Sequence, residues 1–182
     1  MLWEKWSKPK QAPVAVFWDY DNCPVPLGVD TRSFVSSLRL VSAAHGLPVI
    51  FRVYGTPAVM APRARELRDC GVELIRALPG KDIAEKQIYV DVMEFLLDGR
   101  DGTYGSYAVS GVENLDPRQS CVVLISKGTG YYPLLLALEN RAVKKIVITS
   151  LSRRWSIAGV GMQAAQQLVY MADVVYDWNS LG

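Results

Sequence analysis

The fold is decided by the stretch VAVFWDYDNCP, residues 14–24. Its first part, residues 14–18, is apolar without a break, as a strand that is buried on both faces requires. Asp19, Asp21 and Asn22 follow this apolar run. Sheets of parallel strands bind ligands beyond the carboxyl ends of their strands, at the point where the strand order reverses. The stretch therefore predicts a buried strand with a polar site at its end.

Outside this stretch, apolar strand-like runs alternate with helical segments. Such alternation implies a parallel sheet that is covered by helices on both faces. The sequence thus predicts an α/β fold, a three-layer α/β/α sandwich around a central, mostly parallel sheet of five to six strands. Further strands are expected at residues 48–54, 72–78, 120–126, 144–150 and 173–178, and helices at about 31–45, 61–70, 81–97, 131–141 and 158–172.

A length of 182 residues suits a single domain. We expect a short basic and aromatic N-terminal arm over residues 1–12 and one domain over residues 13–182. Residues 99–119 are polar, hold four glycines and show no period, so they predict one long loop. A loop of this length is usually functional or disordered.

Composition excludes several classes of protein. A formal net charge of +2 excludes a strongly basic protein, although a local basic patch suffices to bind nucleic acid. His45 is the only histidine, which excludes zinc clusters and histidine-dependent triads. Three scattered cysteines indicate reduced thiols, and the chain shows neither a membrane-spanning run nor the apolar core of a signal peptide. We expect an intracellular protein, cytoplasmic or nuclear, with an organelle left open.

Acidic side chains occur at two predicted places. Carboxylates at a strand end, such as Asp19, suit a hard divalent ion such as Mg²⁺ or Mn²⁺, which takes oxygen ligands. The alternative is a simple turn, which Asp and Asn also favour. In the helix predicted from residue 81, Glu85 and Asp91 border the apolar stripe that begins at Ala84. Acids there are costly unless they bind a metal or pair with a nearby Lys or Arg, and both interpretations stand.

Three stretches resemble one known family. They are VFWDYDNCPVP from residue 16, GKDIAEKQIYVDVM from residue 80 and VVLISKGTGYYPLLLAL from residue 122. They resemble, in the same order, the motifs of NYN domains, which are PIN-like ribonucleases, and are most similar to the meiosis regulator and mRNA stability factor branch. The resemblance implies a PIN-like sheet in which residues 14–18 and 120–126 are neighbours. It also implies a divalent-metal endoribonuclease that acts on single-stranded RNA in RNA metabolism and the regulation of gene expression.

The resemblance also assigns site residues one by one. Asp19 and Asn22 match the family's first acid and its Asn, and Asp91 matches an acid that is common in the third helix. Glu85 stands where the family usually has Asp. We therefore expect Asp19, Asn22, Glu85 and Asp91 as catalytic residues, and Asp19, Glu85 and Asp91 as ligands of Mg or Mn. We also expect the first three of these residues to share one pocket, with Asp91 at its edge.

The loop after the fourth predicted strand departs from the family. The family usually has Ser-Gly-Asp-x-Asp-Phe, whereas this chain has Ser-Lys-Gly-Thr-Gly-Tyr over residues 126–131. Gly128 and Gly130 thus replace both acids, and Lys127 adds a positive charge beside the gap. A metal nuclease needs several carboxylates around its ion. The sequence therefore predicts weak metal binding at most and weak or absent cleavage.

Two segments predict contact with RNA. Ser126, Lys127 and Thr129 lie in a strand-to-helix turn, where backbone N–H groups and the helix dipole attract phosphate. Arg153, Arg154 and Trp155 combine cations with an aromatic ring in the loop after the fifth predicted strand, and the arm over residues 1–12 does the same. Bases stack on aromatic rings while cations contact phosphates.

The favoured interpretation is an NYN-type protein that binds single-stranded RNA through a degenerate acidic site, a pseudoenzyme or a slow nuclease. We expect no specificity for DNA and no membrane partner, and leave a protein partner or a homodimer open. One alternative is an inactive PIN-like scaffold that binds proteins. A lesser one is a haloacid-dehalogenase-type phosphatase, because Asp19-x-Asp21 follows an apolar strand.

Overall fold

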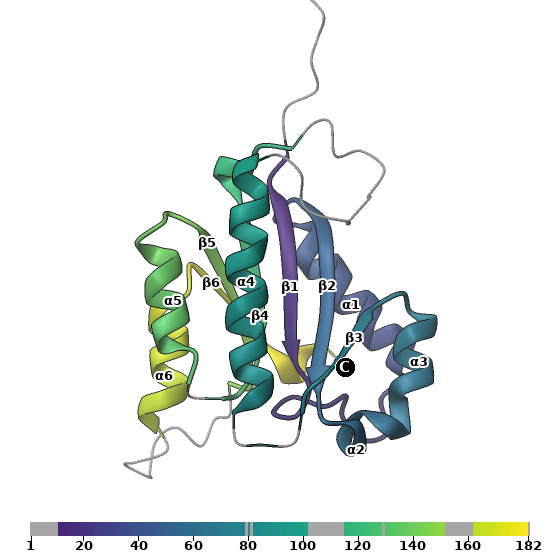
Figure 1. Cartoon of the computed structure of the whole chain (residues 1–182). Coiled ribbons are helices and arrows are strands. Elements are labelled where there is room, and N and C mark those ends of the chain that lie inside the picture. The colour runs from purple at the N-terminus through teal and green to yellow at the C-terminus, as the bar shows by residue number, and fades with distance from the viewer. Residues whose placement is uncertain are drawn as a thin grey trace, which may run out of the picture.

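The computed structural model describes residues 11–78, 80, 82–101, 115–128, 130–151 and 162–181. In them, six parallel strands form one sheet in the order β3-β2-β1-β4-β5-β6 (Figure 1). This confirms the predicted α/β class and the parallel sheet. The strands are β1 Pro13–Asp19, β2 Leu47–Gly55, β3 Glu73–Arg76, β4 Cys121–Ile125, β5 Lys144–Thr149 and β6 Val174–Asp177.

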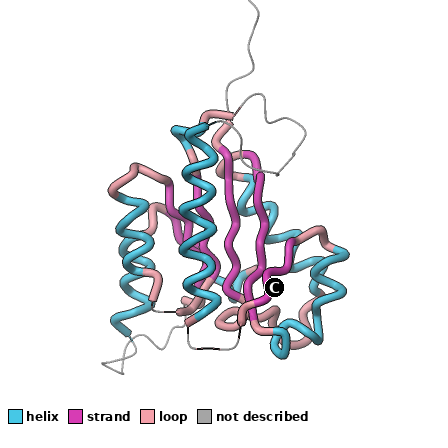
Figure 2. The backbone as a smooth tube through the Cα atoms, in the orientation of Figure 1, coloured by secondary structure: helices cyan, strands magenta, loops and turns pink. Residues whose placement is uncertain are grey.

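Helices cover both faces of this sheet, as Figure 2 shows on the backbone alone. Asp30 caps the first of them, because its side chain accepts a hydrogen bond from the backbone N–H of Ser33. The helices are α1 Thr31–Ala43, α2 Pro57–Met60, α3 Ala64–Asp69, α4 Ile83–Asp101, α5 Tyr132–Glu139 and α6 Met162–Met171. Short 3₁₀ turns occur at Ala61–Arg63, Pro117–Gln119 and Trp178–Ser180.

Strand β1 lies at the centre of the sheet, between β2 and β4. The register with β4 runs from Val14 opposite Cys121 to Trp18 opposite Ile125, which confirms the expected neighbours. The chain winds outward from β1 through β2 to β3, then returns to β4 and winds outward the other way. The carboxyl ends of β1 and β4 therefore meet at the point where the strand order reverses, which is where such sheets bind ligands.

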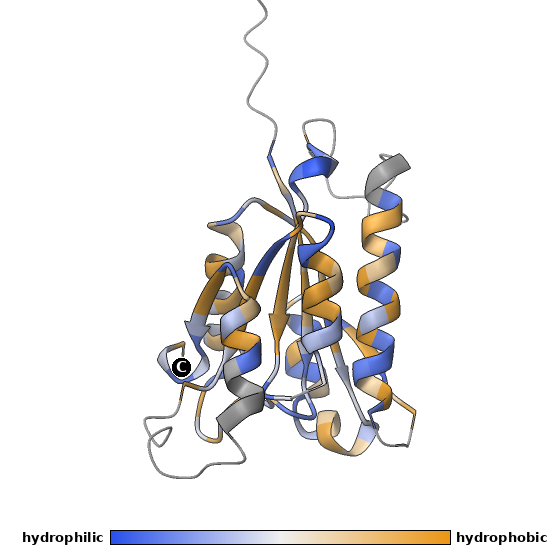
Figure 3. Ribbon diagram, turned by 90° about the vertical axis from the view of Figure 1, so that its left-hand side faces the viewer, coloured by the Kyte–Doolittle hydropathy of each residue, from blue (hydrophilic) through white to orange (hydrophobic). Residues whose placement is uncertain are grey.

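Two apolar layers bury β1 on both faces. Ala15 and Phe17 pack in the layer beneath α4, α5 and α6, whereas Val16 and Trp18 pack in the layer beneath α1 and α3. Figure 3 shows the central strands coloured as hydrophobic. In the second layer, the Trp18 ring lies 5.7 Å from that of Trp178, between ring centroids. This two-sided burial explains the unbroken apolar run at residues 14–18 and fixes the strand end at Asp19.

Several predicted boundaries differ from the observed ones. The helix expected at 61–70 is preceded by a separate helix, α2, because Pro57 and Pro62 each suit the first turn of a new helical segment. Helix α4 extends to Asp101, and residues 117–119 form a 3₁₀ turn within the expected loop. Residues 1–10 and 102–114 lie outside the described residues, so the arm and most of the loop stay predictions. Among the described residues, no helix is long and apolar enough to cross a bilayer.

Candidate functional site

Asp19 is the last residue of β1 and is only 1% exposed. Its carboxylate accepts hydrogen bonds from three side chains in two loops. Oδ2 accepts hydrogen bonds from Asn22 Nδ2 at 2.6 Å, from Ser126 Oγ at 2.9 Å and from the Tyr131 hydroxyl at 2.9 Å. Oδ1 accepts a longer one, 3.3 Å, from the backbone N–H of Asn22. Asp19 thus joins the loop after β1 to the loop after β4.

The direction of these hydrogen bonds is fixed by further contacts. Ser126 Oγ accepts from the backbone N–H of Gly128 at 2.8 Å, which leaves its own proton for Asp19. Burial and the neighbouring charge of Asp19 raise the pKa of Tyr131, so its hydroxyl stays protonated and donates. An ionised carboxylate is an acceptor only, and these donors satisfy most of its capacity. Asp19 is therefore the hydrogen-bonding centre of the site, held by protein donors.

Glu85 faces this centre from the first turn of α4. Burial raises its pKa, and the nearby negative charges of Asp82 and Asp19 raise it further. Its carboxylate lies against the backbone of Gly130, in the space that a Cβ at that position would occupy. Only glycine at position 130 leaves room for the Glu85 side chain in this position. The sequence departs from the family at both positions, with Glu85 in place of Asp and Gly130 in place of an acid, and in the structure these two departures fit together.

Helix α4 makes a second contact with the same loop one turn further on. The Tyr89 hydroxyl donates a hydrogen bond to the carbonyl oxygen of Gly130. The Tyr89 ring also stacks on that of Tyr131, with a centroid distance of 6.1 Å. The chain between β4 and α5 is therefore held from β1 by Asp19 and from α4 by Tyr89.

Asp19 and Glu85 line a small pocket of about 110 Å³, which we call the Asp19 pocket. Such a volume is well below the range of about 300–1,000 Å³ that is typical of small-molecule sites. Four acids contribute to its wall, and Asp19, Asn22 and Glu85 share it as the sequence predicted. The lining consists of Asp19, Asp21, Asn22, Thr56, Ala77, Leu78, Gly80, Asp82, Ile83, Ala84 and Glu85.

Asp21 is held in a structural contact at the edge of this pocket. Its carboxylate accepts hydrogen bonds from the backbone N–H of Thr56, at 2.9 Å to Oδ1, and from the Thr56 hydroxyl at 3.2 Å. Thr56 precedes α2, so Asp21 ties the loop after β1 to the start of that helix. These bonds join residues 35 positions apart, so they are not the local hydrogen bonds of the turn interpretation.

Asp91 does not line the Asp19 pocket, so its predicted place at the pocket edge is wrong. Its Oδ2 accepts a hydrogen bond of 2.5 Å from the Tyr54 hydroxyl and pairs with Arg52 Nη1 at 2.9 Å. Six residues along an α-helix span about 9 Å, and this places Asp91 beside β2, away from Glu85. The alternative, that the acid pairs with a nearby arginine, describes Asp91.

The geometry does not fit a tightly held metal ion. In the part of the chain that the structure describes, no three side chains of His, Cys, Asp or Glu stand close enough together to share a metal. Asp19, Glu85 and Asp91 therefore do not gather around one point as expected. The reason is that Arg52 and Tyr54 hold Asp91, while protein donors occupy Asp19 Oδ2. The catalytic and metal-binding roles of these residues stay predictions.

The predicted phosphate-binding turn is also engaged internally. Ser126 is fully buried and bonded to Asp19, and the N–H of Gly128 donates to Ser126. Lys127 is exposed, and its Nζ lies 5.7 Å from the centroid of the Trp178 ring, a cation–π distance. Among the described residues of this turn, Lys127 is a cation that is exposed to solvent. Thr129 and residues 153–155 lie outside the described residues.

Sequence reasoning missed Tyr131 as a partner of Asp19. The signal was present, because Tyr131 stands where the resembling family usually has Phe, and the added hydroxyl needs a partner once buried. It also missed Asp82, which precedes α4 and lines the pocket. Asp82 has a φ of 58°, an uncommon backbone conformation for a residue with a side chain.

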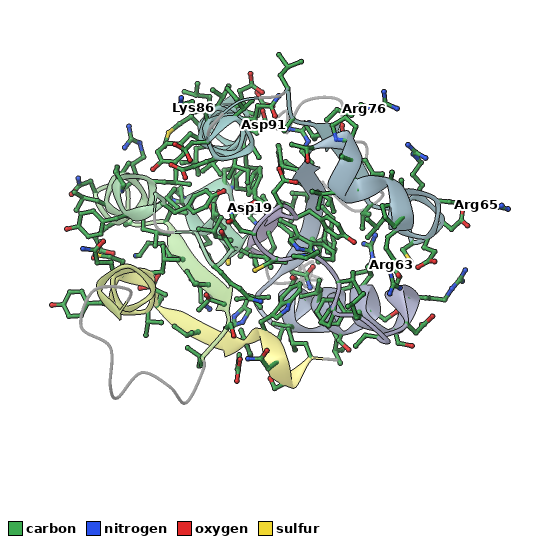
Figure 4. All side chains as sticks on the ribbon, turned by 90° about the horizontal axis from the view of Figure 1, so that it is seen from below. Asp19, Arg63, Arg65, Arg76, Lys86 and Asp91 are labelled. Atoms are coloured by element: carbon green, nitrogen blue, oxygen red, sulfur yellow. The ribbon has the colours of Figure 1, made fainter. Side chains whose placement is uncertain are left out.

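Figure 4 views the molecule from below, toward the carboxyl ends of the strands. Asp19 lies near the centre of this view, with Asp91 and Lys86 toward α4 on one side. Arg63, Arg65 and Arg76 lie on the other side, around α2 and α3. The acidic centre is thus bordered on one side by arginines.

Comparison with known proteins adds two findings. The family model described as NYN domain matches residues 13–172. A protein of Schizosaccharomyces pombe (strain 972 / ATCC 24843), named ferric/cupric reductase transmembrane component 2, is 27% identical to this chain over 127 residues. That match covers 68% of this chain and 21% of the other protein, so it spans about a fifth of the curated relative.

Proposed function

The chain belongs to the NYN domain family, an RNA-related PIN-like nuclease fold, and on that basis we propose that it binds single-stranded RNA at the carboxyl ends of β1 and β4 and cleaves it slowly or not at all. Membership in the family makes RNA the expected substrate class. The degenerate chemistry is our own interpretation of the site.

The observation that carries the proposal is the set of protein donors on Asp19 Oδ2. Three donors bind one carboxylate oxygen, from Asn22, Ser126 and Tyr131. Proteins of this family typically use divalent metals, and a metal would have to compete with these donors. Four acids line the pocket, but among the described residues no three of them stand close enough to share an ion, whereas a divalent-ion site in a nuclease gathers several carboxylates. Mg²⁺ or Mn²⁺ would therefore bind weakly.

RNA binding does not require metal-dependent cleavage. It depends on cations and stacking surfaces around the site, and it weakens as the salt concentration rises. Lys127, exposed beside the pocket, is one such cation. Arg153, Arg154 and Trp155 remain further candidates from the sequence. The resemblance to the meiosis regulator and mRNA stability factor branch, the intracellular location and the lack of DNA specificity stay predictions.

A second candidate function is a scaffold that binds another protein or a second copy of this chain. It is favoured by Val90 and Leu97 of α4, which are 57% and 58% exposed and stand seven residues apart on one helix face. The phosphatase alternative receives no support from the family match. Its second acid, Asp21, is bonded to Thr56.

One preparation assayed for two properties tests the proposal. Single-stranded RNA binding is measured over a range of salt concentrations, and cleavage is measured with Mg²⁺ and with Mn²⁺. We expect salt-sensitive binding and little cleavage. The variants are Asp19→Asn and Glu85→Gln, with Glu94→Gln, an exposed acid on the same helix, as the matched control.

The two possible failures have different meanings. Brisk metal-dependent cleavage that Asp19→Asn abolishes, while Glu94→Gln retains it, would refute the loss of chemistry. The absence of RNA binding at micromolar protein would remove RNA from the account and favour the scaffold. Thermal unfolding is measured first for each variant, so that the binding and cleavage assays use only folded protein.

A further inference from the structure

A second hollow lies between α2, α3 and the edge strand β3, and we call it the arginine pocket. Its volume is about 480 Å³, several times that of the Asp19 pocket and within the range of ligand sites. Its floor is apolar, and two arginine side chains complete the wall. The lining consists of Pro57, Met60, Ala61, Ala64, Arg68, Leu74 and Arg76.

The charges of Arg68 and Arg76 have no partner among the residues that the structure describes. In the described part of the chain, neither guanidinium forms a salt bridge or a side-chain hydrogen bond, and both residues are exposed. Arg63, by contrast, pairs with Glu66 at 3.1 Å. Glu73, the acid at the start of β3, is bound by Arg52 at 2.8 Å. The acids around the pocket are thus occupied, and the two pocket arginines remain for a ligand.

The arginine pocket adjoins the Asp19 pocket through consecutive residues. Thr56 lines the first hollow and Pro57 the second, while Ala77 lines the first and Arg76 the second. Neighbouring Cα atoms are about 3.8 Å apart, so the two hollows meet along this narrow ridge. The N–H of Ala77 donates to the carbonyl of Gly55 at 2.9 Å and holds the two sides of the ridge together. A single-stranded RNA that lies over Asp19 can therefore reach Arg76 with its next nucleotide.

We propose that the arginine pocket binds a nucleotide of single-stranded RNA adjacent to the one at Asp19, with the base on the apolar floor and the flanking phosphates on Arg68 and Arg76. This inference rests on the proposed function and adds the path of the strand. Guanidinium groups match phosphate oxygens with two parallel hydrogen bonds. An apolar surface flanked by cations suits the alternation of base and phosphate, whereas an acidic peptide would leave the apolar floor unused.

The test measures the affinity of a fluorescently labelled oligouridine over a range of salt concentrations. The double variant Arg68→Gln/Arg76→Gln removes both charges. Arg141→Gln is the single-charge control, because Arg141 is exposed at the start of the connection into β5, at the other end of the strands. Ala61→Phe fills the pocket without a change of charge, since Ala61 is exposed at its rim.

We expect the double variant to bind about tenfold more weakly at low salt. Its plot of log affinity against log salt becomes shallower by about 1.4, since each phosphate contact on a single strand contributes roughly 0.7. Ala61→Phe weakens binding but keeps the slope. Arg141→Gln changes neither quantity.

Each other outcome overturns the inference in a recognisable way. If the parent chain binds RNA and the double variant equals Arg141→Gln in affinity and slope, the arginine pocket is not on the path, although the proposed function stands. If the parent binds no RNA, both fail together. If polyglutamate displaces the RNA as well as unlabelled oligouridine does, the surface attracts any polyanion and the nucleotide site is refuted.

Discussion

The Asp19 pocket and the arginine pocket lie side by side and are built in opposite ways. In the first, about 110 Å³ in volume, acids line the wall and protein donors surround Asp19. In the second, about 480 Å³ in volume, two arginines without partners in the described residues flank an apolar floor. The first region stabilises the fold with groups that a nuclease would use for chemistry. The second leaves its arginine charges without partners in the described residues, and we propose that these charges bind RNA rather than hold the fold.

The largest effect should come from Asp19→Ala. The change leaves the buried hydroxyls of Ser126 and Tyr131 without their acceptor, and each unsatisfied buried donor costs about 1–3 kcal/mol. We expect the free energy of unfolding to fall by about 3–5 kcal/mol in a urea titration. Asp69→Ala, which removes an exposed acid, should change it by less than about 0.5 kcal/mol. Equal small losses for both would show that Asp19 is not the centre of the network.

A smaller loss is expected for Gly130→Ala. The new Cβ would overlap the Glu85 carboxylate, which is the end of a flexible, partly exposed side chain that can turn aside, so we expect a loss of less than about 1 kcal/mol. The loss should largely disappear in a Glu85→Ala background, which a double-mutant cycle of urea titrations measures. Gly128→Ala is the control for this relief, because its Cβ would lie 3.1 Å from Ser126 Oγ and 3.3 Å from Asn22 Nδ2, so its loss should not change when Glu85 is removed. If Gly130→Ala lowers the free energy of unfolding equally in the Glu85→Ala background, the side chains at positions 85 and 130 do not compete for one space.

Glu85 should also make stability depend on pH. Because folding raises the pKa of Glu85, the folded protein holds the proton more tightly than the unfolded chain. Its contribution to the unfolding free energy is therefore full at low pH and is lost as pH rises above the ordinary Glu pKa of about 4.3. Glu85→Gln should be more stable than the parent at pH 7, by less than about 1 kcal/mol since the group is partly solvated, and the gap should close in acid.

The control for that prediction is Glu94→Gln, which removes an exposed acid from the same helix. It should follow the parent at every pH in paired urea titrations. A gap for Glu85→Gln that widens toward acid would reverse the sign and imply that the carboxylate is stabilised in its charged form.

The smallest stability effect is expected in the arginine pocket. Arg68→Gln/Arg76→Gln removes no ion pair from the described residues, so its unfolding free energy should stay within about 0.5 kcal/mol of the parent. The same variant should lose RNA affinity as described above. A large stability loss would place these arginines with Asp19 as parts of the framework and remove the contrast between the two pockets.

The sequence alone determined the class of fold and the position of the site in it. The apolar run at residues 14–18 marks β1 as a strand that is buried on both faces, and Asp19 after it marks the strand end. These are local properties, because hydrophobic periodicity and chain order are written residue by residue. The resemblance to NYN domains drew on the same order of motifs, and the family match over residues 13–172 bears it out.

Tertiary structure alone decided what each acid does. Glu85 and Asp91 border the same helix stripe in the sequence, yet one faces Gly130 and the other pairs with Arg52. The surroundings of each acid depend on which strand lies beneath its helical turn. They also depend on side chains that are distant in the sequence, such as Tyr54, which binds Asp91, and Tyr131, which binds Asp19. The arginine pocket was likewise invisible, because α3 and β3 enclose it only after folding. Periodicity fixes which face of an element is buried, whereas the partner of a buried charge is set by packing between elements.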